Sequence, residues 1–324
     1  MKRLRDRRTR RLAALIVVGL IAGMTGGTYA AFSATTSNSG NSFGVKADYE
    51  APTVVRSEIA RTTATAGGRI KANVAYYVFA QITDGGNPAS GVNTANANVC
   101  NITTATCGSV ALSSGSYTMS GLAYNYRSAS KTSDVGLTAG SKTYTITAAD
   151  VAGNSSGAVS FSVVVDTTVP TGSNVQSANG GSTAGKPEAG DTITWTFNES
   201  MEPTAISSGW DGTTTVLVTV AFANNQAGCS SNDAVTVTSV NLGTLCLGGN
   251  GFVTAARTFS NSSMTMSAGG TVVTIALGTA SGATMTQAGT TTMTWTPSAT
   301  ALDVAGNACS TAVVTESGGA DVEF

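Results

Sequence analysis

The pentapeptide Asp-Val-Ala-Gly-Asn occurs twice in the chain, at residues 150–154 and 303–307. A second repeat, Asp-x-x-x-Pro, occurs at 48–52 and 166–170, and its copies lie about 120 residues apart, which suits one sandwich domain. We interpret each Asp-Pro segment as the beginning of a domain and each pentapeptide as the turn before a domain's last strand. In such a turn Asp and Asn can bond to their own backbone, and Gly can supply a positive φ. The repeats therefore predict two related domains.

Between these repeats, short segments alternate apolar and polar side chains, and turn residues separate them about every ten positions. In residues 142–150, Tyr144 and Ile146 share one face and threonines occupy the other, while in 191–197 three large apolar side chains share a face. Period-two alternation is typical of antiparallel strands with one buried face. We expect strands at 74–83, 142–150, 158–165, 191–197, 215–222, 234–240, 271–277 and 292–296.

Composition favours the same fold class. Charged residues make up only 11% of the chain, which is well below the usual share, while Thr, Ser, Ala, Gly and Val dominate. Thr and Val favour strands, and Gly and Ser favour turns. We predict an all-β protein with two tandem antiparallel β-sandwich domains, at residues 48–167 and 168–324, of which the second is larger.

The N-terminal residues have the pattern of an export signal. Residues 2–11 contain seven basic side chains and one acid, and residues 12–24 are apolar and uncharged. Small residues follow, so the segment fits a secretory signal peptide spanning 1–31 and cleaved near Ala30 or Ala31. Two alternatives stay open. The uncharged run extends to about 20 residues and could be an uncleaved membrane anchor, and the arginine pair before it suits a twin-arginine signal.

The segment after the apolar run resembles the junction of exported camelysin/TasA-type proteins, which are processed by a dedicated signal peptidase. The features are Ala-Phe-Ser at 31–33, Thr-Thr-Ser at 35–37 and Gly-Asn-Ser-Phe at 40–43, so the resemblance covers only the N-terminal region. It implies a bacterial protein that is secreted or on the cell surface. In TasA-like proteins the mature N-terminus begins a strand that can enter a neighbour's sheet. Residues 32–47 are therefore expected to be a linker or an exchange strand.

The rest of the chain resembles bacterial immunoglobulin-like (Ig-like) domains, and the second part resembles those of surface and S-layer proteins. In the first part the features are Asp48 and Pro52, the strand at 76–84, the stretch from Gly140 to the Tyr-Thr-Ile-Thr run at 144–147, and residues 150–154. In the second they are Gly-Asp-Thr-Ile-Thr-Trp-Thr-Phe at 190–197, Asn-Glu-Ser-Met at 198–201, and residues 303–307. The resemblance implies two Ig-like sandwiches, a fold that hosts many functions.

Charge and residue content exclude several functional classes. Without the seven basic residues and one acid near the N-terminus, ten basic residues face seventeen acidic ones, so no nucleic-acid partner is expected. The chain has no histidine, which removes Ser-His-Asp and Cys-His catalysis and histidine-ligated metals. Glu199 and Glu202 are close in sequence, but a glycosidase needs two carboxylates placed across a cleft. We expect no catalytic residues, no required cofactor and no enzymatic activity.

Five cysteines lie after the export signal. In an exported protein we expect two local disulfides, Cys100 with Cys107 and Cys229 with Cys246. The alternatives are that all five thiols stay reduced, or that Cys309 pairs within the second domain. A zinc site is not expected, because no Cys-x-x-Cys spacing occurs.

Calcium is the one metal that the sequence allows. Asp150, Asn154, Asp166, Asp84 and Glu50 lie in predicted turns or at the domain junction, and calcium prefers several carboxylate and carbonyl oxygens. The alternative is that Asp150 and Asn154 only cap a turn and that Asp166 does the same in the linker. We predict these five residues as candidate calcium ligands.

Aromatic residues offer a possible binding surface. Tyr117, Tyr124 and Tyr126, with Arg127, could stack on a sugar or a partner, although alternate strand positions are usually core. We expect all three tryptophans, Trp195, Trp210 and Trp295, to belong to the core.

Two functions fit these observations. The first is a non-enzymatic secreted or cell-surface structural protein, such as an extracellular matrix or surface-layer subunit, whose partners are surface or matrix proteins including itself. The second is a monomeric adhesin that binds glycan or a host surface, with or without calcium. In both, the protein meets a membrane only through the signal segment before cleavage.

Overall fold

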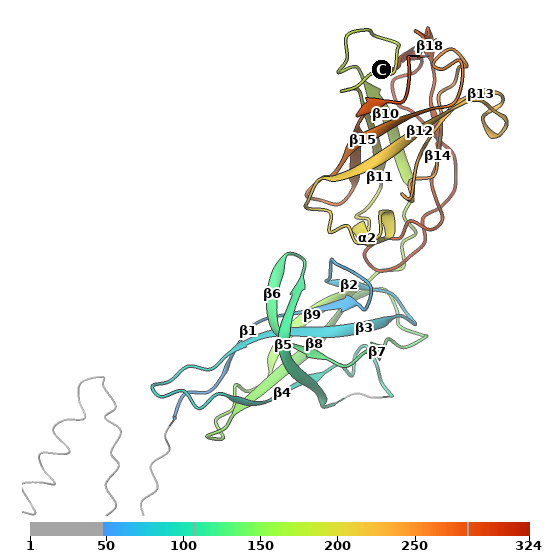
Figure 1. Ribbon diagram of the computed structural model, residues 1–324. Helices are drawn as coiled ribbons and strands as arrows, with labels where there is room; N and C mark the ends of the chain where they lie inside the picture. Colours follow the sequence, from blue (N-terminus) through green and yellow to red (C-terminus); the bar gives the residue numbers. More distant parts are fainter. Residues whose placement is uncertain (1–47, 106–107, 284) are drawn as a thin grey trace, which may run out of the picture.

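The computed structural model describes residues 48–105, 108–283 and 285–324. The predicted signal peptide, its cleavage near Ala30 or Ala31, and the exchange strand at 32–47 all lie outside these residues. The described chain is nearly all β, with two large sheets (Figure 1). The predicted all-β sandwich fold class is confirmed, and the Ig-like topology stays a prediction.

The first sandwich contains nine strands whose pairings form one continuous path, β1-β3-β6-β5-β4-β8-β9-β2, with β7 beside β3. Strand β5 belongs to both layers, because Val110 and Ala111 pair with β4 whereas its residues from Leu112 onwards pair with β6. The strands are β1 (Thr53–Arg61), β2 (Arg69–Ile70), β3 (Ala75–Thr83), β4 (Val92–Asn98), β5 (Val110–Met119), β6 (Leu122–Ser128), β7 (Lys131–Thr132), β8 (Gly140–Asp150) and β9 (Val159–Val165).

The alternation of β8 explains how this core forms. Tyr144, Ile146 and Ala148 are buried, whereas the threonines between them are partly or fully exposed. The Tyr144 hydroxyl reaches β1 in the facing layer, where it donates to Ser57 Oγ at 3.1 Å. Each buried side chain of this size contributes about 1.5–3 kcal/mol by leaving water, so the pattern of β8 selects the face that packs inward.

The second sandwich follows the path β10-β11-β16-β15-β12-β13-β14-β19-β20, with β17 beside β15, and β18 and β21 form a separate pair. The strands are β10 (Gly172–Ala178), β11 (Thr192–Phe197), β12 (Val216–Gln226), β13 (Asn232–Val237), β14 (Thr244–Cys246), β15 (Arg257–Met266), β16 (Val272–Ala276), β17 (Thr279–Ala280), β18 (Thr290–Thr291), β19 (Thr294–Thr296), β20 (Val314–Thr315) and β21 (Asp321–Val322). One short helix, α2 (Pro203–Ile206), and a 3-10 turn, η2 (Ala227–Cys229), interrupt them.

Aromatic rings fill the core of the second sandwich. Trp195, Trp210 and Trp295 are at most 2% exposed, as predicted. Phe197 on β11 packs edge to face against Trp295 on β19, with ring centroids 5.1 Å apart. The Trp295 indole nitrogen donates to the Leu242 carbonyl oxygen at 2.6 Å, so this buried polar group is satisfied.

The predicted strands correspond to β3, β8, β9, β11, β12, β13, β16 and β19, with ends that move by a few residues. The pattern missed several strands rich in Ser, Asn or Gly. The clearest are β5, which contains Ser113–Ser114–Gly115–Ser116, and β15, which contains Ser260–Asn261–Ser262–Ser263. Their polar positions are largely exposed or bonded to the backbone, so hydrophobic alternation is weak.

The cysteines agree with the prediction where the structure describes them. Cys229 and Cys246 form a disulfide, which confirms the second predicted pair. Cys100 is disulfide-bonded, and its predicted partner, Cys107, lies outside the described residues. Cys309 is a buried free thiol. Disulfides are typical of oxidising compartments outside the cytosol.

Among the residues that the structure describes, no helix is long and apolar enough to cross a membrane.

Candidate metal centres and the junction between the sandwiches

The two Asp-Val-Ala-Gly-Asn turns have the same geometry. In the first, Asp150 Oδ1 accepts from the Asn154 amide at 2.7 Å, and Gly153 has a φ of +90°. In the second, Asp303 Oδ1 accepts from the Asn307 amide at 2.7 Å. The glycine of that turn has a φ of +96°. The predicted role of these residues as turn caps is therefore confirmed in both copies.

Each turn also holds the segment that leads into its own sandwich. The Asn154 side-chain amide donates to the Asp48 carbonyl oxygen at 3.1 Å. The Asn307 side-chain amide makes the equivalent bond to the Asp166 carbonyl oxygen, at 3.2 Å. The aspartate of each Asp-x-x-x-Pro repeat therefore meets the aspartate of the pentapeptide repeat, although more than one hundred residues separate them in sequence.

A first acid cluster results at the N-terminal end of the first sandwich. Asp48, Asp84 and Asp150 each offer an oxygen within 4.8 Å of the others. Asp48 accepts from the backbone amides of Ser90 at 2.7 Å and Glu50 at 3.0 Å. These bonds, the Ser90 amide foremost, lower the pKa of Asp48. Asp84 Oδ1 is a buried atom without a hydrogen-bond partner among the described residues.

A second acid cluster occupies the corresponding place in the second sandwich. It contains Asp166, Glu199 and Asp303, again with oxygens within 4.8 Å of one another. Asp166 also pairs with Arg69 of the first sandwich at 2.7 Å. Burial, followed by the charges of Asp166 and Asp303, raises the pKa of Glu199 to about 7. Glu199 Oε1 matches Asp84 Oδ1, because it too is buried and unpartnered among the described residues.

The structure thus divides the five predicted calcium ligands between two places. Asp84 and Asp150 come together, and Asp166 lies in the other cluster. Asn154 uses its side-chain amide to donate to Asp150 Oδ2 at 2.7 Å, and Glu50 is exposed beside the first cluster rather than within it. The five residues therefore do not all come together at one place, and their role as calcium ligands stays a prediction.

Sequence reasoning missed three members of these clusters. Asp48 and Asp303 were visible as the other copies of the two repeats, and superposing the repeats would have selected them. Glu199 comes just after β11, in the place that Asp84 occupies after β3. Because one residue is Glu and the other is Asp, sequence comparison did not show that the two positions correspond. Three converging carboxylates supply the hard oxygen ligands that calcium prefers, so each of these two clusters could hold a calcium ion.

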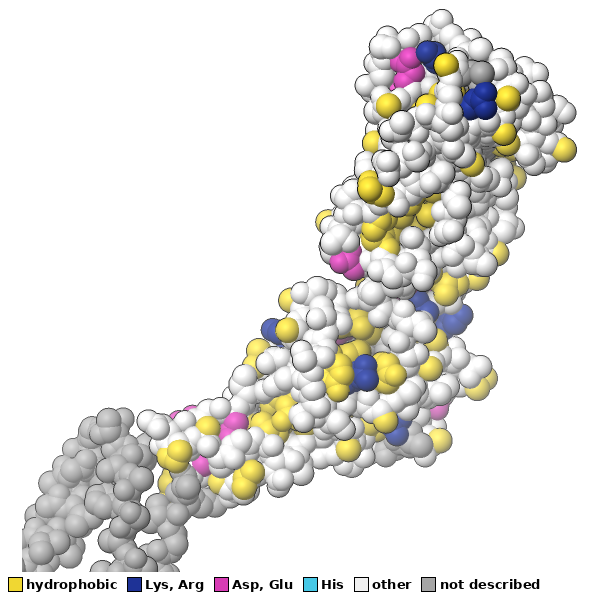
Figure 2. Space-filling model, in the orientation of Figure 1, with side chains coloured by type: hydrophobic (Ala, Val, Ile, Leu, Met, Phe, Trp, Pro, Cys, Tyr) yellow, Lys and Arg dark blue, Asp and Glu magenta, His cyan; other side chains and the backbone are white. Residues whose placement is uncertain are grey.

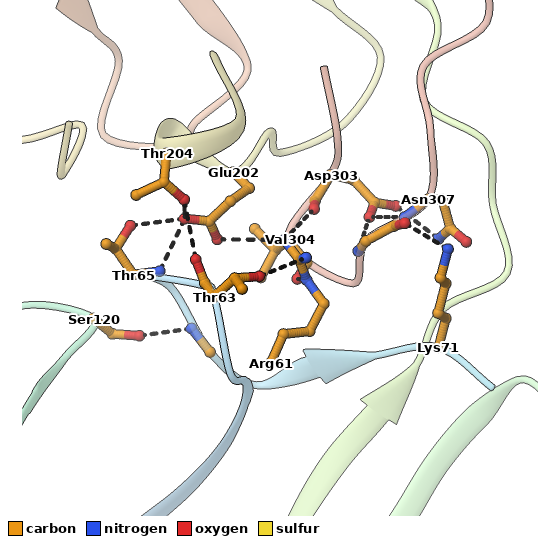
Figure 3. Close-up of polar contacts among 12 residues, drawn as sticks. Arg61, Thr63, Thr65, Lys71, Ser120, Glu202, Thr204, Asp303, Val304 and Asn307 are labelled. Carbon is orange, nitrogen blue, oxygen red and sulfur yellow. Dashed lines mark hydrogen bonds and ion pairs between the residues drawn. The ribbon is translucent and has the colours of Figure 1, made fainter. Parts of the chain in front are cut away.

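The second turn also forms the contact between the sandwiches (Figure 3). Arg61, at the end of β1, is 6% exposed and donates from Nε to the Val304 carbonyl oxygen at 2.9 Å. Lys71 Nζ donates to the Gly306 carbonyl oxygen at 2.6 Å. Val304 is 6% exposed, whereas its counterpart Val151 in the first turn is 67% exposed. The same turn therefore faces solvent in one sandwich and a neighbouring sandwich in the other.

Glu202 of the second sandwich also contacts the first sandwich at this junction. Its Oε1 accepts from the Thr65 amide at 2.9 Å, from the Thr65 hydroxyl at 2.8 Å and from the Thr204 hydroxyl at 2.9 Å. Its Oε2 lies 4.0 Å from Arg61 Nη2. Glu202 is fully buried, so its carboxylate is used in holding the sandwiches together.

The aromatic cluster has a different arrangement from the predicted one. The Arg127 guanidinium lies over both Tyr77 and Tyr117, 4.3 and 4.4 Å from the ring centroids. Tyr124 is buried and donates to Glu58 Oε2 at 3.0 Å. Tyr126 is half-buried. Arg127 thus covers the ring faces that a sugar would need, because cation–π contacts use the same π surface.

Charged side chains are sparse on the face of the molecule drawn in Figure 2, and most of that face is polar and uncharged. Searches of the whole chain against protein-family models and against curated proteins found no match.

Proposed function

We propose that the protein is a non-enzymatic exported component of a cell surface or extracellular matrix, in which two sandwiches form one stiff unit. The observation that carries the proposal is the buried polar junction made by Arg61, Glu202 and Val304. A flexible tether between binding domains would need no such contact. A structural subunit must keep its domains in a fixed relative orientation, and a buried polar junction of this kind would do so.

The energetics of the junction favour one fixed arrangement. Contacts between domains of one chain are by default weak enough to permit relative motion. Here, separation would leave the Arg61 and Glu202 charges without the partners described above. Hydrogen bonds to charged groups contribute about 1.5–3 kcal/mol each, and separation would break those that Arg61, Lys71 and Glu202 make across the junction. A polar interface with several directed hydrogen bonds also selects one geometry, because few orientations form all of these bonds at once.

Export and oxidation support the same proposal. The Cys229–Cys246 disulfide suits an oxidising compartment, and residues 1–31 have the features of a signal peptide. A polar surface with few charges, as in Figure 2, is consistent with a component that works outside the cell.

Self-association is the part of the proposal that concerns partners. Within the described residues, β1 ends its strand path and pairs only with β3. An unpaired strand edge can accept another strand. Residues 32–47 of a neighbouring chain would be the strand that joins it, as the resemblance to TasA-type proteins implies.

The test compares two purified oxidised forms, one beginning at Ala31 and one at Asp48, by negative-stain microscopy and light scattering. Filaments or large assemblies from the longer form alone support a matrix subunit. Monodisperse monomers from both forms contradict self-association and favour the adhesin, which glycan titrations would then examine.

Calcium-dependent stiffening is the alternative that the two acid clusters favour. Each cluster contains a buried oxygen without a hydrogen-bond partner among the described residues, Asp84 Oδ1 or Glu199 Oε1. A calcium ion in the second cluster would lie beside the junction and add to its rigidity. Small-angle scattering with calcium and with a chelator tests this. An unchanged profile would contradict calcium-dependent stiffening and leave the stiff junction itself untouched.

A further inference from the structure

A third group of acids lies at the far end of the second sandwich, in the segment 316–323. Glu316 follows β20, Asp321 begins β21, and Glu323 comes directly after β21. Gly318 and Gly319 between them have φ angles of +103° and +86°. This left-handed turn brings the ends of the segment together. The three acids each offer an oxygen within 4.8 Å of the others.

Two of these acids are buried, and in each of them only one carboxylate oxygen accepts a hydrogen bond from a described donor. Glu316 is 6% exposed, and its Oε1 accepts from the Met293 amide at 2.8 Å. Glu323 is 1% exposed, and its Oε2 accepts from the Ser177 hydroxyl at 2.5 Å. The remaining oxygens, Glu316 Oε2 and Glu323 Oε1, are buried without a hydrogen-bond partner among the described residues. Each carboxylate therefore has one oxygen fixed by the fold. The Glu316 and Glu323 side chains also lie within hydrogen-bonding reach of each other, but neither has a proton to donate when both are ionised.

No basic group compensates these charges within the described chain. The ion pairs there involve other residues, and the groups that act on Glu323 are hydroxyl or acidic. Buried carboxylates in such a place are stable only when a proton or a cation joins them.

We propose that Glu316, Asp321 and Glu323 bind a hard divalent cation of the calcium class. All three ligands are carboxylates and the chain has no histidine, so the donor set suits calcium or magnesium rather than zinc or copper. Asp321 is exposed, which gives the ion a route from solvent and leaves room for water ligands. This site is separate from the two clusters described above and from the junction.

The cation would fasten the last segment of the sandwich to its first strand. Ser177 lies on β10, where its hydroxyl donates to Glu323 and accepts from the Phe324 amide at 3.1 Å. The Phe324 ring packs between Phe222 and Phe252, with centroids 5.7 and 5.8 Å away. Neutralising the carboxylates holds this segment in place, and the core behind it is then covered.

Calorimetric titration of the full oxidised chain with calcium chloride, and separately with magnesium chloride, tests the proposal. The expected results are that Glu323→Gln binds one cation fewer than the unaltered chain, and that Asp321→Asn weakens the same site. Asp321 is exposed, so the second substitution tests the site without disturbing buried contacts. In thermal unfolding, a cation at about one hundred times its Kd should raise the Tm of the second sandwich by about 5–10 °C.

Glu199→Gln is the matched control, because it removes a carboxylate from the junction cluster and leaves the third group intact. If Glu199→Gln loses a cation and Glu323→Gln does not, the proposal is overturned. It is equally overturned if neither calcium nor magnesium binds to the full oxidised chain.

Discussion

Arg61 Nε donates to the carbonyl oxygen of Val304 at 2.9 Å, across a sequence separation of 243 residues. This bond joins the end of the first strand of one sandwich to the last turn of the other. In the first turn the equivalent residue, Val151, is exposed to solvent and has no such contact with the described residues of the other sandwich. The same turn therefore faces solvent in the first sandwich and forms the domain contact in the second. The residues packed against the turn decide between these two roles.

Substituting Arg61 tests the junction. Arg61→Met keeps most of the aliphatic stem but leaves the Val304 oxygen and the Glu202 carboxylate without their partner. We expect a loss of about 2–4 kcal/mol in the free energy of unfolding and a larger radius of gyration by small-angle scattering. Lys142→Met is the control, because Lys142 bonds only locally to Thr138. An unchanged radius in Arg61→Met would show that the polar junction does not set the relative orientation.

The two turn glycines separate backbone strain from the junction. Gly153→Ala and Gly306→Ala both place a side chain at a positive φ, which costs about 1–2 kcal/mol. A Cβ on Gly153 meets nothing within 4 Å, whereas a Cβ on Gly306 would lie 2.9 Å from Arg61 Cδ. We expect Gly306→Ala to be the more destabilising substitution in chemical denaturation. Equal losses would mean that the sandwiches do not pack as closely as described.

Cys309 should be unreactive in the folded protein. It is 3% exposed, and burial, followed by the charge of Glu199, raises its pKa to about 11. Iodoacetamide at pH 8 is expected to label it only in denaturant, as one mass adduct per chain if the remaining cysteines are paired. Fast labelling of the native chain would contradict its burial.

The Cys309 thiol also affects stability at high pH. The folded state favours the neutral thiol, so its contribution is complete below the ordinary pKa of 9.0 and is lost as pH rises through about 11. Cys309→Ala should lose less stability than the unaltered chain over that range of pH. Parallel decreases in both proteins would contradict this assignment.

Glu188 should contribute to stability at acid pH. Its carboxylate accepts from Lys186 Nζ at 3.0 Å, the Ser182 hydroxyl at 2.9 Å and the Thr183 amide at 2.9 Å. These bonds, the Lys186 bond foremost, lower its pKa from 4.5 to about 2. The contribution is complete above pH 4.5 and is lost as pH falls towards 2. Urea unfolding from pH 5 to pH 2 should show a smaller decline in Glu188→Gln, and an identical decline would contradict the prediction.

Much of the fold was predictable because the alternation of side chains is a local property. Within a few residues, the alternation shows which face of a strand is buried, as with Tyr144 and Ile146 on β8 or Ile193 and Trp195 on β11. Strands such as β5 and β15 carry polar residues at positions that are exposed or bonded to the backbone of adjacent residues, while their own backbones pair with neighbouring strands. Their strand character depends on those neighbours, so local alternation did not reveal it.

The acid clusters show the same division. Asp150 and Asp84 were recognisable from their turns, but nothing near Glu199 in sequence indicates that it meets Asp166 and Asp303. The grouping depends on where strand ends converge, and that is a property of sheet topology. The same holds for Glu316 and Glu323, whose burial depends on strand β10 and the phenylalanine core.

The sequence by itself determined the all-β class, the two repeated turns, the tryptophan core and the Cys229–Cys246 pair, because each depends on residue type and short spacing. Only the tertiary structure decided that Arg61 meets Val304 and that Glu202 is buried between the sandwiches. It also decided that Arg127 covers Tyr77 and Tyr117. These contacts join residues far apart in sequence, and their energies come from desolvation and hydrogen-bond geometry that exist only once the strands are assembled.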